Sequence, residues 1–207
     1  WFTPGLSLVL RDFGTSILFA MVADSVPEAL DHVTWPVHLQ VQEDAFQAVS
    51  RHATITRALS MIRMGWNGAP AAVGHGAARL AAGDVEALQR LYADGEATGE
   101  APDFFFPSMV TDGVFFGVYE GDALVAAAGT HLYSPGEGAA AIGNIYTRRD
   151  RRARGLGRLV TGAVVEALSG IETVGLNVRA DNAAALGLYE SLGFVRHCAF
   201  YEALGHR

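Results

Sequence analysis

The sequence predicts an α+β (mixed α/β) fold, in which a central mixed, mostly antiparallel sheet is flanked by helices and preceded by a smaller α/β lobe. Three observations support this fold class. Apolar residues make up 50% of the 207 residues and charged residues 18%, so the chain can bury a large core and is not disordered. Apolar residues recur with a helical period in some segments and alternate or run together in others. After residue 76 the elements follow the order strand, helices, three-strand meander, helix, strand, helix, strand, which is typical of mixed α/β domains.

The stretch 65–76, with the sequence GWNGAPAAVGHG, divides the chain. It holds four Gly and one Pro in twelve residues, and no hydrophobic period continues across it. We therefore expect an N-terminal α/β lobe over residues 1–64, a linker over 65–76 and a larger domain over 77–207.

The N-terminal lobe combines alternating apolar runs with short helical patterns. These patterns predict, in chain order, a strand at Leu6–Leu10, a turn at Asp12–Thr15, a strand at Ser16–Ala23, a helix at Val26–Val33, a strand at Val37–Val41, a helix at Glu43–His52 and a strand at Thr54–Met64. None of its residues has catalytic spacing, so we expect this lobe to be structural.

The larger domain has clearer patterns. The helix at Gly155–Leu168 is the clearest, because its apolar residues recur at i, i+3, i+4 and i+7. The full order of predicted elements is a strand at Ala77–Leu80, helices at Gly83–Tyr92 and Asp103–Val110, strands at Gly113–Tyr119, Ala123–Tyr133 and Ala139–Thr147, the helix at Gly155–Leu168, a strand at Thr173–Val178, a helix at Asn182–Leu192 and a strand at Phe194–Leu204.

An arginine-rich loop opens the helix at Gly155. Glycines at 155 and 157 allow close approach of a ligand to the backbone, and a helix N-terminus favours an anion. Six of the 15 basic residues fall between 148 and 158, which predicts a ligand with several phosphates; a solvated loop is the alternative interpretation. The loop is not a P-loop, because GKS/T is missing, and it is not GxGxxG, because Val160 stands at the third glycine position.

A second cluster lies on the helix at Asn182–Leu192. Asn182 and Tyr189 are seven residues apart and so share one helix face, with Ala185 and Leu188 between them. Taken alone, Asn182 is more typical of a helix N-cap and Tyr189 of a core aromatic with a solvated hydroxyl.

Taken together, the two clusters resemble the GNAT superfamily of acyl-CoA-dependent N-acyltransferases. The resemblance rests on Arg152-x-x-Gly155-x-Gly157 at a helix start, followed by Asn182-x-x-Ala185-x-x-Leu188-Tyr189-x-x-x-Gly193-Phe194, and it covers roughly residues 76–204. The segment 113–202 is similar to a bacterial subgroup that carries an extra N-terminal α/β lobe, which would account for the first 64 residues.

The resemblance implies a site for acetyl-CoA. The pantetheine arm would bind the backbone of Ile145, Tyr146 and Thr147 at a strand end, next to a splay between the strands that end near Thr147 and Val178. Asn182 would hold the pantetheine or phosphate region with Asn177 nearby, Ala185 would line the same helix face, and Tyr189 would point at the thioester sulfur. The pyrophosphate would bind the loop formed by Arg152, Ala153, Arg154, Gly155, Leu156, Gly157 and Arg158.

The general base departs from the family's pattern. Many members carry a Glu on the strand before the loop, and the corresponding position here is Ala141, in a run without a carboxylate. The remaining candidates are His131, Glu137, Tyr146 and a water held by Asn144. His131 has the most suitable ordinary pKa, although a lone His on a strand is more often structural.

We therefore expect an N-acetyltransferase that moves an acetyl group from acetyl-CoA to an amine, with catalytic residues Tyr189 and His131. The alternative is a non-catalytic module that binds or senses acyl-CoA.

The net charge of −7 disfavours nucleic acid as a partner, and the scattered His residues predict no metal site. No apolar run spans a membrane, and the single Cys198 suits a reducing cytoplasm. The patterns indicate neither the acceptor nor the oligomeric state.

Overall fold

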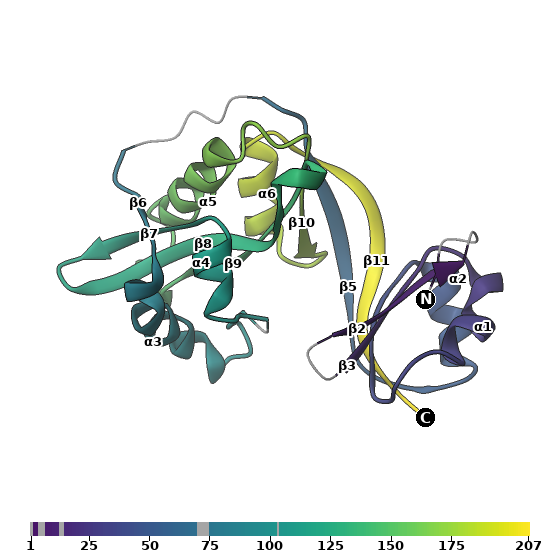
Figure 1. Ribbon diagram of the computed structural model, residues 1–207. Coiled ribbons are helices and arrows are strands. Elements are labelled where there is room, and N and C mark those ends of the chain that lie inside the picture. The colour runs from purple at the N-terminus through teal and green to yellow at the C-terminus, as the bar shows by residue number, and fades with distance from the viewer. Residues whose placement is uncertain (1, 4–6, 13–14, 70–74, 103) are drawn as a thin grey trace. The chain divides into compact units, whose positions relative to one another are not determined.

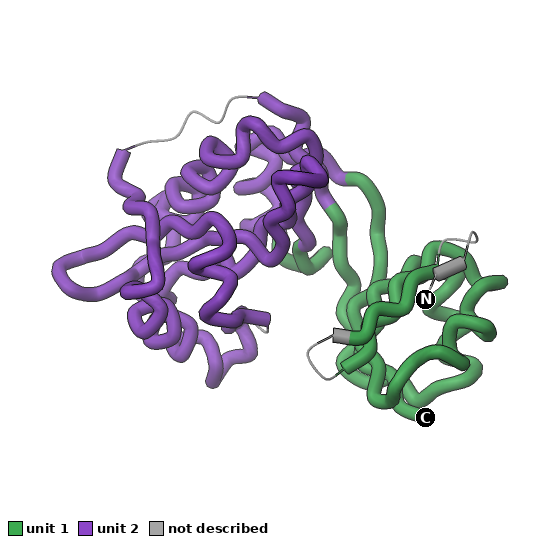
Figure 2. Tube along the Cα trace, in the orientation of Figure 1, with its two compact units in different colours: residues 1–63, 178–182, 197–207 green, residues 64–177, 183–196 purple. Residues whose placement is uncertain are grey.

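The computed structural model describes residues 2–3, 7–12, 15–69, 75–102 and 104–207. Parts of four predicted segments lie outside these residues: Leu6 of a predicted strand, residues 13–14 of the predicted turn, residues 70–74 of the predicted linker, and Asp103 of a predicted helix. The chain forms two compact units, of residues 1–63, 178–182 and 197–207 and of residues 64–177 and 183–196 (Figure 2).

Unit 1 is a small α/β layer with the strand order β1-β2-β3-β4-β11. Strands β2 and β3 form an antiparallel hairpin, β3 and β4 are parallel, and the C-terminal part of β11 pairs antiparallel with β4. The elements are β1 Phe2–Thr3, β2 Ser7–Asp12, β3 Thr15–Ala20, α1 Val26–Leu30, β4 Val37–Val41, α2 Glu43–Ser50, β5 Thr54–Trp66, which continues into unit 2, and β11 Phe194–His206, which begins there.

The core of unit 1 follows from strand alternation. In β3 and β4 every second side chain is buried, as the period of two in a strand requires when one face is covered. Leu18 and Leu39 point into this face and meet Val26 of α1 and Val49 of α2, and all four are at most 1% exposed. Burial of such side chains stabilises each unit by about 1.5–3 kcal/mol per residue.

Unit 2 contains the sheet β10-β9-β8-β7-β6, in which β10 and β9 are parallel and the other neighbours are antiparallel. The predicted mixed, mostly antiparallel sheet is therefore confirmed. The elements are β6 Ala78–Arg79, α3 Val85–Glu96, α4 Ser108–Asp112, β7 Phe115–Glu120, β8 Ala123–Ser134, β9 Ala139–Thr147, α5 Leu156–Ala167, β10 Thr173–Arg179 and α6 Ala183–Ser191.

Helices cover both faces of this sheet. Figure 1 shows α3 and α4 on one side of it and α5 and α6 on the other. Because both faces are covered, Leu124–Thr130 of β8 is buried at every position. Small side chains make this possible: a Cβ at Gly129 would overlap the ring of the fully buried Phe115. Strand β9, by contrast, alternates buried and half-buried side chains up to Thr147.

Most predicted elements are observed within a few residues, but the predicted helix at Asp103–Val110 is wrong over its first half. Residues 104–107 have no helical structure, and α4 begins only at Ser108. Pro107 explains the difference, because the ring of a proline disfavours helical backbone at the preceding residue. Phe104 and Phe106 instead pack edge to face, with ring centroids 4.9 Å apart. The predicted helix at Val26–Val33 is also shorter, since α1 ends at Leu30.

Candidate functional site

The sheet of unit 2 opens at one end of β9. Within the described residues the pairing of β9 with β10 ends at Ile142 and Leu176, whereas β9 itself continues to Thr147. On its other side β9 stays paired with β8, as far as Thr147 opposite Ala126. The backbone of Ile145–Thr147 therefore has one edge in the sheet and one edge without a β10 partner, at the place where the sequence predicts a pantetheine-binding strand.

Two irregularities in the β8–β9 ladder shape this end of the sheet. Residues 144 and 145 of β9 oppose a single residue of β8, and Asn144 takes a left-handed backbone conformation with φ 52°. The hydroxyl of Tyr92 donates to the Asn144 carbonyl at 2.9 Å and so fastens this bulge to α3. The second irregularity inserts His131 into β8, between residues that pair with Ile142 and Ala141.

His131 lies on the bulged part of β8 with one side of its ring against the sheet. The ring meets the backbone of Gly143, where a Cβ would overlap it, and it contacts Phe104 edge to face at 5.9 Å between centroids. Solvent still reaches the side chain. Desolvation by the surrounding protein lowers the pKa of the imidazole below its usual 6.5, and the neighbouring Asn144 side chain opposes part of this lowering. The ring is therefore neutral at pH 7 and can accept a proton.

The other candidates for a base are less suited to that role. The Tyr146 hydroxyl donates to Asp94 at 2.8 Å, and desolvation together with this carboxylate raises the pKa of Tyr146. Glu137 lies in a solvent-exposed 3₁₀ turn, Pro135–Glu137. Compared with these two side chains, His131 is better suited to act as a base. Its side chain is accessible, and its pKa lies below 7, so the ring is free to accept a proton at pH 7.

The predicted anion-binding loop runs from a 3₁₀ turn, Arg149–Arg151, to the start of α5. Ala153 and Gly155 have positive φ values of 61° and 77°, and α5 begins at Leu156. The loop backbone thus leads into the first turn of a twelve-residue helix, whose free N–H groups attract an anion. Apart from Gly155 and its two chain neighbours, the described residues have no atom within 4 Å of the position that a Cβ of Gly155 would take.

Gly157 has a packing role that the sequence pattern does not reveal. A Cβ at Gly157 would lie 3.3 Å from Leu188 Cδ1 of α6 and 3.5 Å from Thr147 Oγ1 of β9. The missing side chain therefore lets the first turn of α5 approach both neighbours. The packing also places the end of β9, the start of α5 and one face of α6 together, as the resemblance implies.

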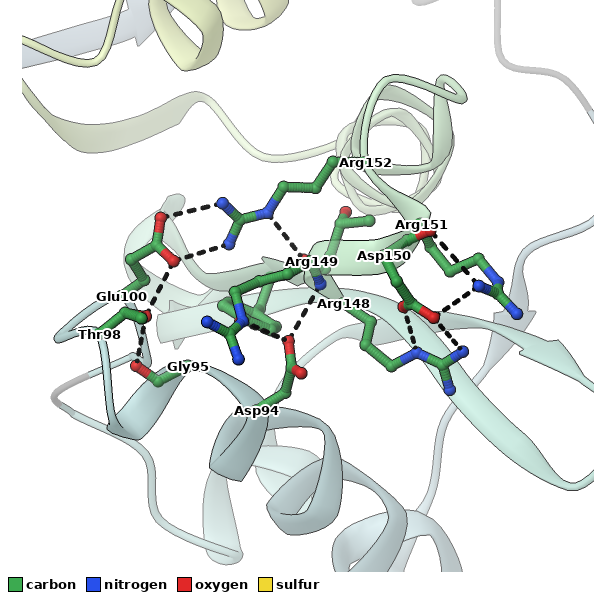
Figure 3. Close-up of polar contacts among 11 residues, drawn as sticks. Asp94, Gly95, Thr98, Glu100, Arg148, Arg149, Asp150, Arg151 and Arg152 are labelled. Carbon is green, nitrogen blue, oxygen red and sulfur yellow. Dashed lines mark hydrogen bonds and ion pairs between the residues drawn. The ribbon is translucent and has the colours of Figure 1, made fainter.

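Carboxylates pair with most of the loop's arginines, which corrects the expectation of a strongly positive loop (Figure 3). Arg158 donates to the Ser191 hydroxyl at 3.3 Å, and in the part of the chain that the structure describes Arg154 takes part in no ion pair. Backbone N–H groups are therefore the main anion ligands that the loop offers. Among the described residues these ion pairs are Arg148 with Asp150 at 2.6 Å, Arg149 with Asp94 at 3.6 Å, Arg151 with Glu120 at 2.7 Å and with Asp150 at 2.6 Å, and Arg152 with Glu100 at 2.9 Å.

Tyr189 lies on α6 with a buried ring and an unused hydroxyl. The side chain is 7% exposed, and its ring meets Phe194 edge to face at 6.2 Å. Among the described residues no hydrogen bond involves this hydroxyl, and its oxygen is not sealed from solvent. Burial raises the pKa of Tyr189 to about 12, so the hydroxyl is protonated at pH 7.

The polar residues around α6 are solvent-exposed. Asn182 precedes the helix, and its backbone N–H donates to the Arg179 carbonyl at 3.0 Å. Asn177 is exposed on β10, and Ala185 is half-buried on α6. Asn182 is grouped with unit 1, so the contacts within unit 2 do not place it at the loop.

The sequence pattern does not reveal the carboxylates that hold the loop, above all Asp94 and Glu100. Asp94 lies 55 residues before Arg149, and Glu100 lies 52 before Arg152, so no local pattern joins them. Within the described ranges no three His, Cys, Asp or Glu side chains form a possible metal site. No helix in the described part of the chain is long and apolar enough to cross a membrane.

This architecture, a mixed sheet whose parallel pair opens at one end between helices on both faces, defines a GNAT-like α/β fold. The chain belongs to the acetyltransferase (GNAT) family, whose sequence profile matches residues 71–194. The resemblance predicted from the two clusters is thereby confirmed.

Three known proteins show how far the similarity extends. A mycothiol acetyltransferase of Geodermatophilus obscurus is 39% identical over 104 residues, which are 47% of this chain and 32% of that protein. A ribosomal protein bS18-alanine N-acetyltransferase of Salmonella typhimurium is 42% identical over 73 residues, 32% of this chain and 49% of that protein. The solved GCN5-related N-acetyltransferase from Kribbella flavida has a TM-score of 0.66 at 21% identity, covering 99% of this chain and 88% of that one. The matches thus span a third to a half of the curated relatives, and the solved structure supports the fold.

Proposed function

We propose that the protein is an acetyl-CoA-dependent N-acetyltransferase that acts on an amine. The observation that carries this proposal is the open end of β9 beside the start of α5, with the unused Tyr189 hydroxyl on the adjoining α6. Family membership supports it, and so do the names of both curated relatives, which are acetyltransferases.

The residues present fit coenzyme A. The unpaired edge of Ile145–Thr147 can hydrogen-bond an extended pantetheine arm, and the N–H groups from Arg152 to Arg158 can hold its pyrophosphate. Asn177 and Ala185 would line the arm. When bound, acetyl-CoA would supply a thioester whose carbonyl carbon the amine attacks and whose sulfur is the leaving group.

Two side chains would move the protons of this reaction. His131, neutral at pH 7, takes a proton from the amine, directly or through a water, as the new C–N bond forms. Tyr189 gives its proton to the sulfur as the C–S bond breaks and is reprotonated from solvent. Backbone N–H groups near the β9 bulge are suited to stabilise the negative charge that develops on the carbonyl oxygen.

Two observations bear on the choice of the acceptor amine. The names of these relatives refer to molecules as different as mycothiol and the alanine of a ribosomal protein. The net charge of −7 favours a cationic amine over an acidic one.

The test is to incubate the protein with acetyl-CoA and a panel of amines, including peptides with N-terminal alanine and small amino sugars, and to measure free thiol. Cys198 adds at most one thiol per chain, so turnover appears as thiol in excess of protein. Acetyl-CoA binding by calorimetry without amine-dependent thiol release, across the whole panel, would favour the non-catalytic acyl-CoA-binding module. Absence of binding would exclude both functions.

A further inference from the structure

The end of α3 fastens the exit of β9 through a single carboxylate. Asp94 Oδ2 accepts a hydrogen bond from the Tyr146 hydroxyl at 2.8 Å. It accepts a second from the backbone N–H of Arg149 at 3.0 Å (Figure 3). The Arg149 guanidinium adds an ion pair at 3.6 Å. These bonds, first that from the Arg149 backbone and then that from Tyr146, lower the pKa of Asp94, so it is ionised at pH 7.

The position of these bonds on the chain gives them their importance. Tyr146 is the next-to-last residue of β9, and Arg149 begins the 3₁₀ turn that leads to the loop before α5. Asp94 therefore holds the chain on both sides of Thr147, between the open strand edge and the anion-binding loop. Because one of its bonds goes to a backbone N–H, it fixes the path of the chain itself rather than one side chain.

Glu100, six residues further on, contacts the same loop in a different way. Its two oxygens meet the Arg152 guanidinium at 2.9 and 3.2 Å, and Thr98 donates to it at 2.9 Å. Both partners of this pair are more than 40% exposed. Glu100 thus pairs with the Arg152 guanidinium, which an anionic ligand in the loop could otherwise contact. Glu100 and such a ligand would therefore compete for Arg152.

We propose that Asp94 is a positioning residue for the ligand loop, and that it raises the affinity for coenzyme A while Glu100 lowers it. This inference rests on the proposed function. Both residues carry one negative charge close to the loop, so simple repulsion of phosphates would make both lower the affinity. The opposite signs follow only from the geometry, in which Asp94 holds backbone and Glu100 holds a competing arginine.

The matched variants are Asp94→Asn and Glu100→Gln, each of which replaces a carboxylate by an amide of the same shape. Calorimetric titration of the full chain with coenzyme A measures the affinity. Asp94→Asn is expected to bind about fivefold more weakly, because hydrogen bonds to a charged acceptor become bonds to a neutral one. Glu100→Gln is expected to bind about two- to fivefold more tightly, because an exposed ion pair no longer competes.

Two further measurements separate positioning from folding. The melting temperature of each ligand-free variant reports stability, and a purely structural Asp94 would lower it without changing affinity at a temperature well below melting. Tyr146→Phe removes one of the two short bonds to Asp94 and leaves the other, so it is expected to weaken binding by about threefold even if Asp94→Asn folds poorly.

Each outcome has a definite meaning. Tighter binding by both amide variants, or binding by Asp94→Asn and Tyr146→Phe within twofold of the wild type, overturns the positioning role while leaving the proposed function intact. Unchanged or weaker binding by Glu100→Gln overturns the competition. A wild-type protein that does not bind coenzyme A overturns this inference and the proposed function together.

Discussion

The Tyr189 hydroxyl is the part of the proposed mechanism that a single atom can test. Its ring is 7% exposed and packs against Phe194, and no hydrogen bond among the described residues uses its oxygen. Tyr189→Phe therefore keeps the packing and breaks no bond to the protein. We expect the free energy of unfolding to change by less than about 0.5 kcal/mol, below the value of a typical hydrogen bond.

Turnover is expected to change far more than stability. If the hydroxyl protonates the leaving sulfur, its loss lowers turnover by about 10²–10⁴-fold, the usual contribution of a positioned general acid. Affinity for acetyl-CoA is expected to stay the same, because the charge on sulfur develops only during the reaction. The assay is thiol release with the most active amine of the panel, beside calorimetric binding and urea unfolding of the same protein.

Tyr119→Phe is the matched control. The Tyr119 hydroxyl donates to Asp84 at 2.6 Å on the surface of unit 2, so this variant loses an exposed hydrogen bond and is expected to keep normal turnover. Normal turnover in Tyr189→Phe would refute proton donation. A marked loss of stability in that variant would instead show that the hydroxyl has a structural partner.

Three further predictions concern the base, the helix start and alkaline pH. His131→Gln is expected to lower turnover and to remove the rise of kcat/KM with pH that wild-type His131 produces below pH 6.5, since its lowered pKa places proton loss there; an unchanged pH profile would assign the base elsewhere. Gly157→Val is expected to cost about 1–3 kcal/mol in urea unfolding, because its Cβ would press on Leu188, and to weaken binding of coenzyme A; equal stability would contradict the packing. Burial raises the pKa of Tyr189 from about 10 in the unfolded chain to about 12 in the folded protein. The free energy of unfolding is therefore unaffected by this group below pH 10 and falls by about 2–3 kcal/mol between pH 10 and 12. In Tyr189→Phe the free energy of unfolding should fall less steeply over that range.

Local patterns predicted most of the fold because they reflect which side chains each element buries. The helical period at 155–168 corresponds to α5, whose Val160, Val164 and Val165 are fully buried. The apolar run at 139–147 corresponds to β9. The prediction failed where a single backbone effect outweighs the pattern. Phe104–Phe106 look like part of a helix by composition, but Pro107 stops the helix from starting before Ser108.

The candidate site could be predicted only where its residues lie close together in sequence. The segment 152–158 is one loop and one helix turn, so its spacing was enough to predict an anion site, which stays a prediction. Among the described carboxylates that pair with the arginines of residues 148–152, Asp150 lies in the loop itself, whereas Asp94, Glu100 and Glu120 come from distant parts of the sequence. The loop is therefore less positive than its composition predicts. The reason for Gly157 was likewise hidden, because Leu188 reaches it only through the packing of α5 on α6.

The irregular pairing of β8 with β9 places His131 where it could act as the proposed base, although Ala141 carries no carboxylate. Residues 141 and 143 are two apart on β9 and so share a face. The extra residue in β8 is His131, and its ring lies on Gly143, which has no side chain to exclude it. The neighbouring strand thus brings an imidazole to the face where many members of the family carry a glutamate. Desolvation keeps that imidazole neutral, as a base requires, and supports the role proposed for His131.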